Sequence, residues 1–431
     1  MTRPVLFSRG RVLDPRNGVD GVRDVLLREG RVAEVSEAPL SVADADLVDA
    51  RGLWVTPGFV DLHVHFREPG EEAKETILTG SRAAVAGGFT SVVTMPNTRP
   101  TNDSALVTGL VLTRARDAGL CRIFPAGAIT VGLQGEQLAE MGALIDAGCV
   151  CITDDGRPVM NASLMRRALQ YAQLFDVPVM VHEEDLTLSG KGLMTEGSTA
   201  TRLGLLPIPA SAEVAMVARD LVLLEETGGR LHIAHLSCEG SVRLVREAKR
   251  RGLRVTAEAT PHHFTLEDSA VGAYDTHAKM NPPLRLARDV LAVREALADG
   301  TVDAIATDHA PHGPLDKDVE FDRALNGVVG LETAWGLTQA LVDAGHLPPL
   351  RAVALLSDGP ARAFGLRGGH LSVGAPGDVT LVDPREAWTV DAQRFQSKSR
   401  NTPFHGRALT GRVVETWVGG ARMFARGEVA R

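Results

Sequence analysis

Short apolar segments recur through the middle of this 431-residue chain, and patterns typical of helices separate them. We expect β-strands at residues 59–65, 90–96, 122–129, 149–155, 177–182, 231–236, 254–259 and 304–308. Helical patterns cover 71–86, which Gly87-Gly88 closes, and 211–227, which opens with Ser211 as a cap and ends at Gly228-Gly229. Strands that alternate with helices in this number predict the α/β class and a (β/α)8 TIM barrel.

Both ends of the chain have a different pattern, in which short β-strands are joined by tight turns. Residues 25–35 predict a hairpin that turns at Glu29-Gly30. Residues 378–382 predict a strand, and residues 413–424 predict a hairpin that turns at Gly419-Gly420. We therefore expect a small β-sandwich-like domain built from residues 1–56 and 367–431, and a barrel domain at residues 57–366.

Composition restricts where such a chain works and what it binds. A hydrophobic content of 44% with 4% aromatic residues is typical of a soluble globular protein. We expect no transmembrane helix and no signal peptide, because no apolar run is long enough, and we therefore predict a cytoplasmic protein. The four cysteines form no Cys-x-x-Cys pair, which indicates reduced, buried thiols. A net charge of −8 without a basic cluster argues against nucleic acid as a partner.

Chemically active side chains gather where the expected strands end, which is where barrel enzymes place their active sites. These residues are His63, His65, Asn97, Asp154, Asp155, Gly156, His182, His235, Asp308, His309 and His312. Four histidines and two carboxylates at strand ends can hold two divalent metal ions. His182 alone could be a hydrogen-bonded core residue, and Asp155-Gly156 alone could be a turn. Their joint occurrence at matching strand ends favours a metal centre.

The alternation of side chains along a strand distinguishes between neighbouring candidates. In the first strand, Asp61, His63 and His65 should share the inner face, and Leu62, Val64 and Phe66 should pack outward on helices. In the fourth, Val150 and Ile152 should face outward, and Cys149, Cys151, Thr153 and Asp155 should face inward. Asp155 is therefore preferred over Asp154 as a ligand. The same alternation places His235 opposite His232, which we interpret as structural.

Five motifs carry a resemblance to a known family. They are Asp-Leu-His-Val-His-Phe-Arg-Glu-Pro-Gly at 61–70, Thr-Met-Pro-Asn at 94–97, Thr-Asp-Asp-Gly at 153–156, Ala-Thr-Asp-His-Ala-Pro-His at 306–312 and Gly-Leu-Glu-Thr at 330–333. The chain resembles the dihydroorotases of the amidohydrolase superfamily, in the branch found in many bacteria, over essentially its whole length. The resemblance implies reversible hydrolysis of (S)-dihydroorotate to N-carbamoyl-L-aspartate in de novo pyrimidine (UMP) biosynthesis.

The resemblance also implies roles for individual residues. One Zn²⁺ would be held by His63, His65 and Asp308, a second by His182 and His235, and Asp155 would bridge the two. Asp308 would also be the catalytic residue, which takes a proton from the attacking water and delivers it to the ring nitrogen. Substrate would contact His65, Arg67, Asn97, Asn281, His312 and the backbone at Asn326 and Gly327, where the family often has an aromatic residue before the glycine. Many relatives bridge their metals with a carboxylated lysine at the end of strand four, where this chain has no lysine.

Two alternatives stay open at this stage. An allantoinase or dihydropyrimidinase would share the barrel and the histidines, but Arg67 favours a substrate that carries a carboxylate, unless it forms a salt bridge with Glu68 or Glu71. A non-catalytic scaffold subunit for aspartate transcarbamoylase should have lost metal ligands, and all six are present. We expect a homodimer, and a complex with aspartate transcarbamoylase is compatible with catalysis. Residues 260–284 and the segment after His312 are candidates for a lid.

Overall fold

Eight parallel strands form the central sheet of the computed structural model, which describes residues 3–430. In spatial order they are β15 (Ala304–Ile305), β14 (Val255–Ala259), β13 (Leu231–Ile233), β10 (Val179–Val181), β9 (Cys151–Thr153), β8 (Arg122–Gly127), β7 (Phe89–Thr94) and β6 (Phe59–Val64). A parallel bridge between Val64 and His309 brings the two edges of this sheet together. Every strand predicted for the barrel is present in a shorter form, and the (β/α)8 barrel is confirmed.

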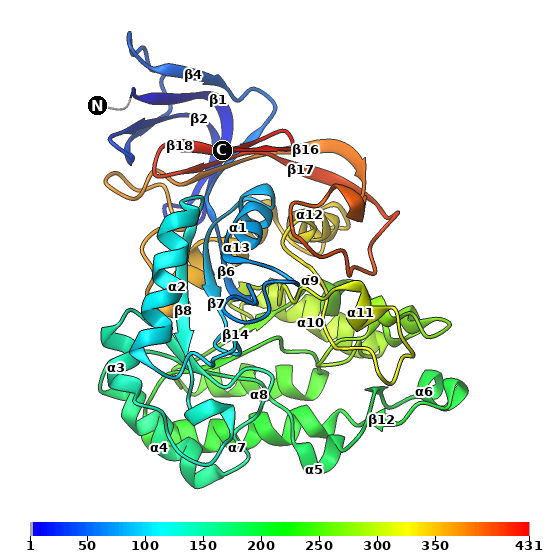
Figure 1. Cartoon of the computed structure of the whole chain (residues 1–431). Helices are drawn as coiled ribbons and strands as arrows, with labels where there is room; N and C mark the ends of the chain where they lie inside the picture. Colours follow the sequence, from blue (N-terminus) through cyan, green and yellow to red (C-terminus); the bar gives the residue numbers. More distant parts are fainter. Residues whose placement is uncertain (1–2, 431) are drawn as a thin grey trace.

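Helices surround this sheet on its outer side (Figure 1). The longer ones are α1 (Ile77–Ala86), α2 (Ala105–Ala118), α3 (Met141–Asp146), α4 (Ala162–Gln173), α7 (Ser211–Thr227), α8 (Glu239–Arg250), α10 (Ala287–Asp299), α12 (Ala334–Asp343), α13 (Pro349–Leu356) and α14 (Asp358–Phe364). Other elements are α5 (Leu186–Ser189), α6 (Ser198–Leu203), α9 (Pro261–Thr265), α11 (Pro314–Lys317) and a strand pair, β11 (Met194–Thr195) with β12 (Pro207–Ile208).

One predicted helix start and one predicted helix cap are wrong. Helix α1 begins at Ile77 rather than at residue 71, because the Thr76 side chain accepts a hydrogen bond from the Thr79 N–H and caps the helix there. Ser211 is the first residue of α7 and makes no capping hydrogen bond, since the helix is preceded by Ala210. The predicted ends are confirmed, because Gly87 follows α1 and Gly228 closes α7 in the left-handed conformation.

Two apolar clusters separate the inside of the barrel from its outside. Outward side chains such as Ile152 pack with helix residues, whereas Val60 and Leu62 pack inward with Phe364 of α14. The prediction that Leu62 faces outward is therefore wrong, whereas Val64 and Phe66 pack in the outer cluster as predicted. The register between β6 and β7 shifts between Asp61 and Val64, and this irregularity reverses the alternation.

The fourth strand departs from its predicted alternation for a different reason. Ile152 packs outward and Cys151 inward, as predicted. Cys149 was predicted to face inward but lies in the outer cluster, and Val150 was predicted to face outward but packs against the inner one. Both residues precede β9, which begins at Cys151, so the period of a strand does not apply to them.

Strands from both ends of the chain form a second, mostly antiparallel sheet. They are β1 (Val5–Asp14), β2 (Val19–Arg28), β3 (Arg31–Ser36), β4 (Asp46–Asp49), β5 (Trp54–Pro57), β16 (Val379–Thr389), β17 (Ala408–Val418), β18 (Ala421–Ala425) and β19 (Glu428–Val429). Their order is β19-β18-β17-β16-β5-β1-β2-β3, with β4 also paired to β1. The hairpins at Glu29-Gly30 and Gly419-Gly420 are confirmed. The domain bounds given above stay a prediction.

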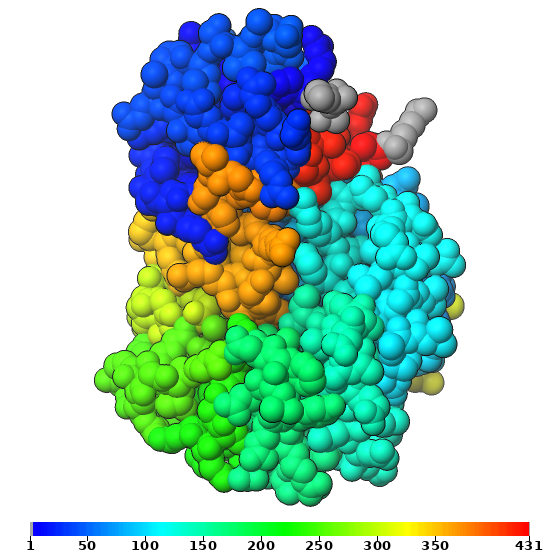
Figure 2. Space-filling model, turned by 90° about the vertical axis from the view of Figure 1, so that its left-hand side faces the viewer, coloured from blue at the N-terminus to red at the C-terminus, as the bar shows by residue number. Residues whose placement is uncertain are grey.

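Parts of the chain that are distant in sequence contact one another around the terminal sheet. Figure 2 shows the N-terminal strands in blue beside the residues near 370 in orange. There the Val32 N–H donates to the Ala375 carbonyl at 2.9 Å. The segment between β16 and β17, which contains a short helical turn at Ala392–Arg394, leaves the sheet and extends toward the barrel (Figure 1). The four cysteines are buried and unpaired, as predicted. Within residues 3–430, no helix has both the length and the apolar character to cross a membrane.

Candidate metal centre

Two groups of buried side chains meet at the carboxyl ends of the barrel strands. In each group the potential ligand atoms lie within 4.8 Å of one another, and the groups are His63, His65 and Asp155, and Asp155, His182 and His235. Asp155 belongs to both. Its Oδ1 lies 3.2 Å from His63 Nε2 and 3.8 Å from His235 Nε2, and its Oδ2 lies 3.5 Å from His65 Nε2. A carboxylate placed in this way can bridge two cations.

Asp308 lies beside the first of these groups. Its Oδ1 is 3.0 Å from His65 Nε2 and 3.5 Å from His63 Nε2. Burial raises the pKa of the Asp308 carboxyl, but the neighbouring His63 and His65 outweigh this effect and lower the pKa well below its ordinary value. Asp308 is therefore ionised at neutral pH and can act as a ligand or as a base.

Asp154, the neighbour of Asp155, is turned away from the centre. Its Oδ1 accepts hydrogen bonds from the Ile129 and Thr130 N–H groups at 2.8 and 3.0 Å. Its Oδ2 accepts from the Thr130 hydroxyl. The side chain thus anchors the loop after β8, and only Asp155 projects toward the histidines.

Hydrogen-bond partners determine which ring nitrogen of each histidine faces the centre. Glu258 Oε1 lies 2.8 Å from His63 Nδ1, and Asn97 Oδ1 lies 3.0 Å from His65 Nδ1. An acceptor on Nδ1 leaves the Nε2 lone pair free. Among the described residues, the buried Nε2 of His63 forms no hydrogen bond, although Asp155 Oδ1 lies 3.2 Å away. An unpaired nitrogen of this kind is explained by a metal ligand, and imidazoles with carboxylates suit zinc-like divalent cations.

His182 presents the other ring nitrogen. Its Nε2 lies 3.3 Å from Glu184 Oε2, whereas its Nδ1 lies 2.9 Å from His235 Nε2. Glu184 also accepts a hydrogen bond from Asn281 Nδ2 at 2.8 Å. The second group is therefore oriented by Glu184, which the sequence pattern did not single out although it lies two residues after His182.

Glu258 is the second residue that the sequence analysis missed. Its Oε2 lies 3.1 Å from His232 Nε2, and His232 Nδ1 lies 2.7 Å from the Thr256 hydroxyl. Burial would raise the pKa of Glu258, but the hydrogen bonds with His232 and His63 lower it to about 2. The sequence could have indicated Glu258, because it is the single charged residue of the buried strand β14.

Three residues of the site have strained backbone conformations. Arg67, His235 and Asp308 have φ angles of 62°, 33° and 47°, in a region that side chains other than glycine rarely adopt. Each such residue costs about 1–3 kcal/mol and persists only where surrounding contacts enforce it. Their concentration around one centre is typical of a functional site.

A cavity of about 240 Å³ opens over the centre. It is lined by His65, Arg67, Asn97, Asp155, Gly156, His182, His235, Asn281, Asp308, Ala310, His312, Leu325, Asn326 and Gly327. The structure thus brings all the predicted site residues together, with His63 buried below the cavity floor. Gly327 has a φ of 128°, and an added Cβ would lie 2.6 Å from Ala310 Cβ, so no larger residue fits there.

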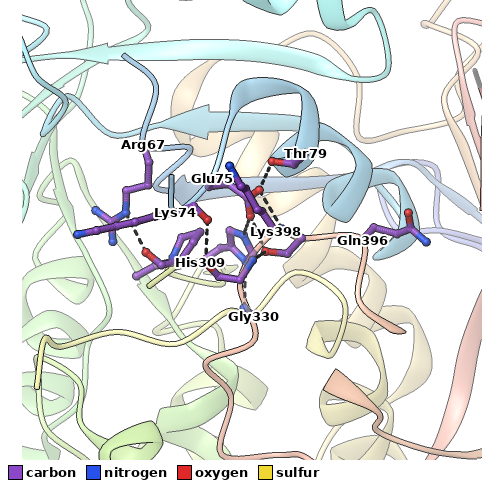
Figure 3. Close-up of polar contacts among 12 residues, drawn as sticks. Arg67, Lys74, Glu75, Thr79, His309, Gly330, Gln396 and Lys398 are labelled. Atoms are coloured by element: carbon purple, nitrogen blue, oxygen red, sulfur yellow. Dashed lines mark hydrogen bonds and ion pairs between the residues drawn. The ribbon is translucent and has the colours of Figure 1, made fainter. Parts of the chain in front are cut away.

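Arg67 lines this cavity, and Figure 3 shows its side chain and polar contacts. Its Nε donates to the Pro311 carbonyl at 3.2 Å, and its Nη2 lies 3.5 Å from His312 Nε2. The described contacts contain no salt bridge between Arg67 and Glu68 or Glu71. Glu68 instead lies 3.3 Å from Arg114, and Glu71 lies 3.0 Å from Lys74. The guanidinium is therefore free to bind an anionic group of a ligand.

The two candidate lid segments are tied to each other by buried lysines. Lys279 Nζ donates to the carbonyls of Phe321 and Ala324 at 2.6 and 2.7 Å. Lys317 Nζ donates to the carbonyls of Thr276 and Lys279 at 2.9 and 3.1 Å. The assignment of a lid stays a prediction.

Two family models match the chain. Residues 52–241 match the model described as Dihydro-orotase-like, and residues 243–424 match the Amidohydrolase family. Curated relatives named dihydroorotase include one from Anaeromyxobacter sp. (strain K), 60% identical over 100% of both chains. Another, from Syntrophotalea carbinolica, is 55% identical over 96% of this chain and 98% of its own.

Solved structures of related enzymes have the same fold. The L-hydantoinase (dihydropyrimidinase) from Arthrobacter aurescens has a TM-score of 0.89 and 26% identity, over 100% of this chain and 98% of that chain. A dihydropyrimidinase from Brevibacillus agri has a TM-score of 0.84 over 99% and 96% of the two chains, but at 21% identity it shows the fold alone. Because the curated relatives match this chain along its whole length at such identity, the chain belongs to the dihydroorotase family.

Proposed function

We propose that this protein catalyses the reversible hydrolysis of the cyclic amide of (S)-dihydroorotate to N-carbamoyl-L-aspartate. The observation that carries this proposal is the Arg67 guanidinium, which lines the cavity above the histidines and has no carboxylate partner among the described ion pairs. Dihydroorotate carries a carboxylate that suits a guanidinium. The identity with relatives named dihydroorotase supports the same reaction. The reaction would serve pyrimidine biosynthesis in the cytoplasm.

Two zinc ions per chain are part of this proposal. His63, His65 and Asp308 would hold one ion, His182 and His235 would hold the other, and Asp155 would bridge them. The nitrogen lone pairs and the ionised carboxylates described above suit that assignment. When bound, the cations would supply hydroxide near neutral pH and polarise the ring carbonyl.

Asp308 would move the proton in this reaction. Its ionised carboxylate lies at the cavity, where it would accept a proton as water attacks the ring carbonyl. It would then deliver that proton to the ring nitrogen as the carbon–nitrogen bond breaks. In the biosynthetic direction the same carboxylate would take the proton from the ureido nitrogen, and ring closure would release water.

The remaining cavity residues would bind and orient the substrate. Arg67 would pair with the substrate carboxylate, and Asn97 and His312, which also line the cavity, would contribute hydrogen bonds. Asn281 and the backbone at Gly327 would contact the rest of the ring. His65 would contact substrate as well as metal. These contacts would fix the ring carbonyl over the histidines, which is the position that hydrolysis requires.

A hydantoinase or dihydropyrimidinase activity is the second candidate, because solved structures of such enzymes share the fold. Their cyclic substrates lack the carboxylate that Arg67 would bind. The scaffold alternative is disfavoured because the six residues assigned as ligands are all present and lie close to one another. A homodimer and a complex with aspartate transcarbamoylase remain proposals that catalysis does not require.

The test combines metal analysis of the purified protein with assays on dihydroorotate, dihydrouracil, hydantoin and allantoin. We expect about two zinc ions per chain and turnover of dihydroorotate in both directions. Faster turnover of dihydrouracil or hydantoin than of dihydroorotate would refute the substrate assignment. A single zinc ion with full activity would refute the two-metal scheme and leave the substrate assignment intact.

A further inference from the structure

The segment from Gln396 to Asn401, which is part of the connection between β16 and β17, contacts the barrel beside the candidate active site. We call it the connecting segment. Ser397, Ser399 and Asn401 of this segment are buried, whereas Lys398 between them is exposed. The segment belongs in sequence to the terminal sheet, but its hydrogen-bond partners lie in the loops that follow β6 and β15. These loops carry Arg67, Asp308 and His312.

Asn401 makes the most informative contacts of the connecting segment. Its Nδ2 donates to the carbonyls of Ala310 and Gly327 at 2.9 and 3.0 Å. Its Oδ1 accepts from the His312 N–H at 3.0 Å, and its own carbonyl accepts from the Val329 N–H at 2.9 Å. The side chain is 2% exposed. One buried amide therefore fixes the distance between the two backbone stretches that would contact substrate at His312 and Gly327.

A second set of contacts begins at Glu75, just before α1 (Figure 3). Glu75 accepts hydrogen bonds from the Ser397 hydroxyl and, at 3.1 Å, from the Lys398 N–H. Its Oε2 also lies 3.4 Å from Nε2 of His309. His309 directly follows Asp308, and its Nδ1 accepts from the Gly330 N–H at 3.1 Å. The connecting segment thus reaches the residue beside the proposed base through one buried carboxylate.

Glu332 holds the other end of the connecting segment. Both of its oxygens lie 2.9 Å from the Gln396 N–H, and one lies 3.1 Å from the Ser397 N–H. Glu332 belongs to the Gly-Leu-Glu-Thr motif, for which the proposed reaction gives no role. Its position explains the glutamate, because a carboxylate at this point fixes the backbone that leads to Asn401.

We propose that Asn401 is a positioning residue for substrate binding, and that the connecting segment holds the His312 and Gly327 backbones at the spacing that the substrate requires. The inference rests on the proposed function for the identity of the substrate. Asn401 lines no part of the cavity and acts through the loops it joins. Asp308 and the histidines have separate partners, so loss of the amide contacts should affect binding more than the chemical step.

The test compares Asn401→Asp and Asn401→Ser with the wild type. Aspartate replaces the donating amide with an oxygen that faces two carbonyls, and serine removes the contacts without adding charge. We expect KM for dihydroorotate to rise about 10- to 100-fold, with kcat changed less than about 3-fold and zinc content unchanged. Hydrogen–deuterium exchange should become about 10-fold faster in peptides covering residues 308–313 and 326–330.

Thr380→Val is the matched control. Thr380 is also fully buried in the terminal sheet, and its hydroxyl donates to the Gly88 carbonyl of the barrel at 2.7 Å, away from the cavity. This variant should lose stability but keep the wild-type KM and the wild-type exchange in both peptides. Equal changes in KM for Thr380→Val and Asn401→Ser would show general loosening and refute the proposal.

The remaining outcomes separate this inference from the proposed function. If Asn401→Asp does not fold, Asn401→Ser with its control decides the question. Wild-type KM in a folded Asn401 variant would overturn the inference, even if exchange became faster. Failure of the wild type to hydrolyse dihydroorotate would instead refute the proposed function, and the exchange in the two peptides would then decide whether Asn401 holds these loops.

Discussion

Substitution of Glu258 provides the sharpest test of how buried carboxylates orient the metal-binding histidines. Its carboxylate is fully buried and is shared between His63 Nδ1 at 2.8 Å and His232 Nε2 at 3.1 Å. In the Glu258→Gln variant one of these two N–H groups must face an NH₂ group. The variant therefore loses one acceptor and the negative charge at nearly constant shape.

The size of the effect follows from the same contacts. The pKa of Glu258 falls from 4.5 to about 2, which corresponds to ~3 kcal/mol in favour of the charged form. Loss of a residue that orients a metal-binding histidine typically weakens metal affinity by about 10- to 100-fold. We expect Glu258→Gln to fall in that range, because His63 would more often carry its proton on the Nε2 that should bind metal.

Competition with a chromophoric chelator would measure zinc affinity without relying on activity, and cobalt substitution would report the ligand set by its absorption spectrum. Thr256→Val is the control, because it removes only the hydroxyl that contacts His232 Nδ1 at 2.7 Å. It should change zinc affinity less than about 3-fold. Unchanged affinity in Glu258→Gln, or an equal loss in both variants, would refute the orienting role of Glu258.

Four further predictions concern the site and its surroundings. Arg67→Met should lower kcat/KM for dihydroorotate by roughly 2–5 kcal/mol in transition-state terms at normal zinc content, and wild-type kcat/KM would refute its role. Asp308→Asn should lower kcat by about 10²- to 10⁴-fold, and a wild-type kcat would refute its role in moving the proton. Asp155→Ala should lose at least one zinc and most activity, Asp154→Ala should lose less, and the apo-protein should regain activity with zinc in bicarbonate-free buffer. A bicarbonate requirement would contradict a native carboxylate bridge. Burial and a neighbouring lysine lower the pKa of Lys317 from 10.5 to about 7, so above pH 7 the unfolded chain holds a proton that the folded chain has released. The free energy of unfolding should therefore rise between pH 7 and 10 by up to ~1 kcal/mol per pH unit. In denaturant unfolding, the Lys317→Met variant should lack this contribution to the pH dependence.

The barrel could be predicted because its signals are local. Apolar segments and glycines mark each strand and helix end within a few residues, and the ligand candidates follow directly after the strands. The alternation failed at Leu62 and at Cys149 and Val150. A register shift and a late strand start depend on the neighbouring strands, and the sequence of one strand does not report them.

Residues that support the site could not be predicted in the same way. Glu258 lies 195 residues from His63, and Asn401 lies 89 residues from His312. Asn401 lies outside the barrel strands, so the rule that located the ligands does not apply to it. Glu258 lies one residue before the end of β14, but the sequence does not show that His63 and His232 are its partners. Their roles depend on which elements become neighbours in three dimensions, and this information appears only when the chain is folded.

The interleaved order of the terminal sheet has a consequence for synthesis of the protein on the ribosome. Strand β5 is paired to β1 on one side and to β16 on the other, and the Thr56 hydroxyl bonds the Thr380 carbonyl 324 residues later. At ordinary elongation rates this interval lasts on the order of tens of seconds, during which the backbone edge of β5 has no partner. An open edge can pair with other chains, so nascent chains should depend on chaperones until β16 emerges. Asn401 is translated later still, and the loops that it joins can be fixed only when synthesis is nearly complete.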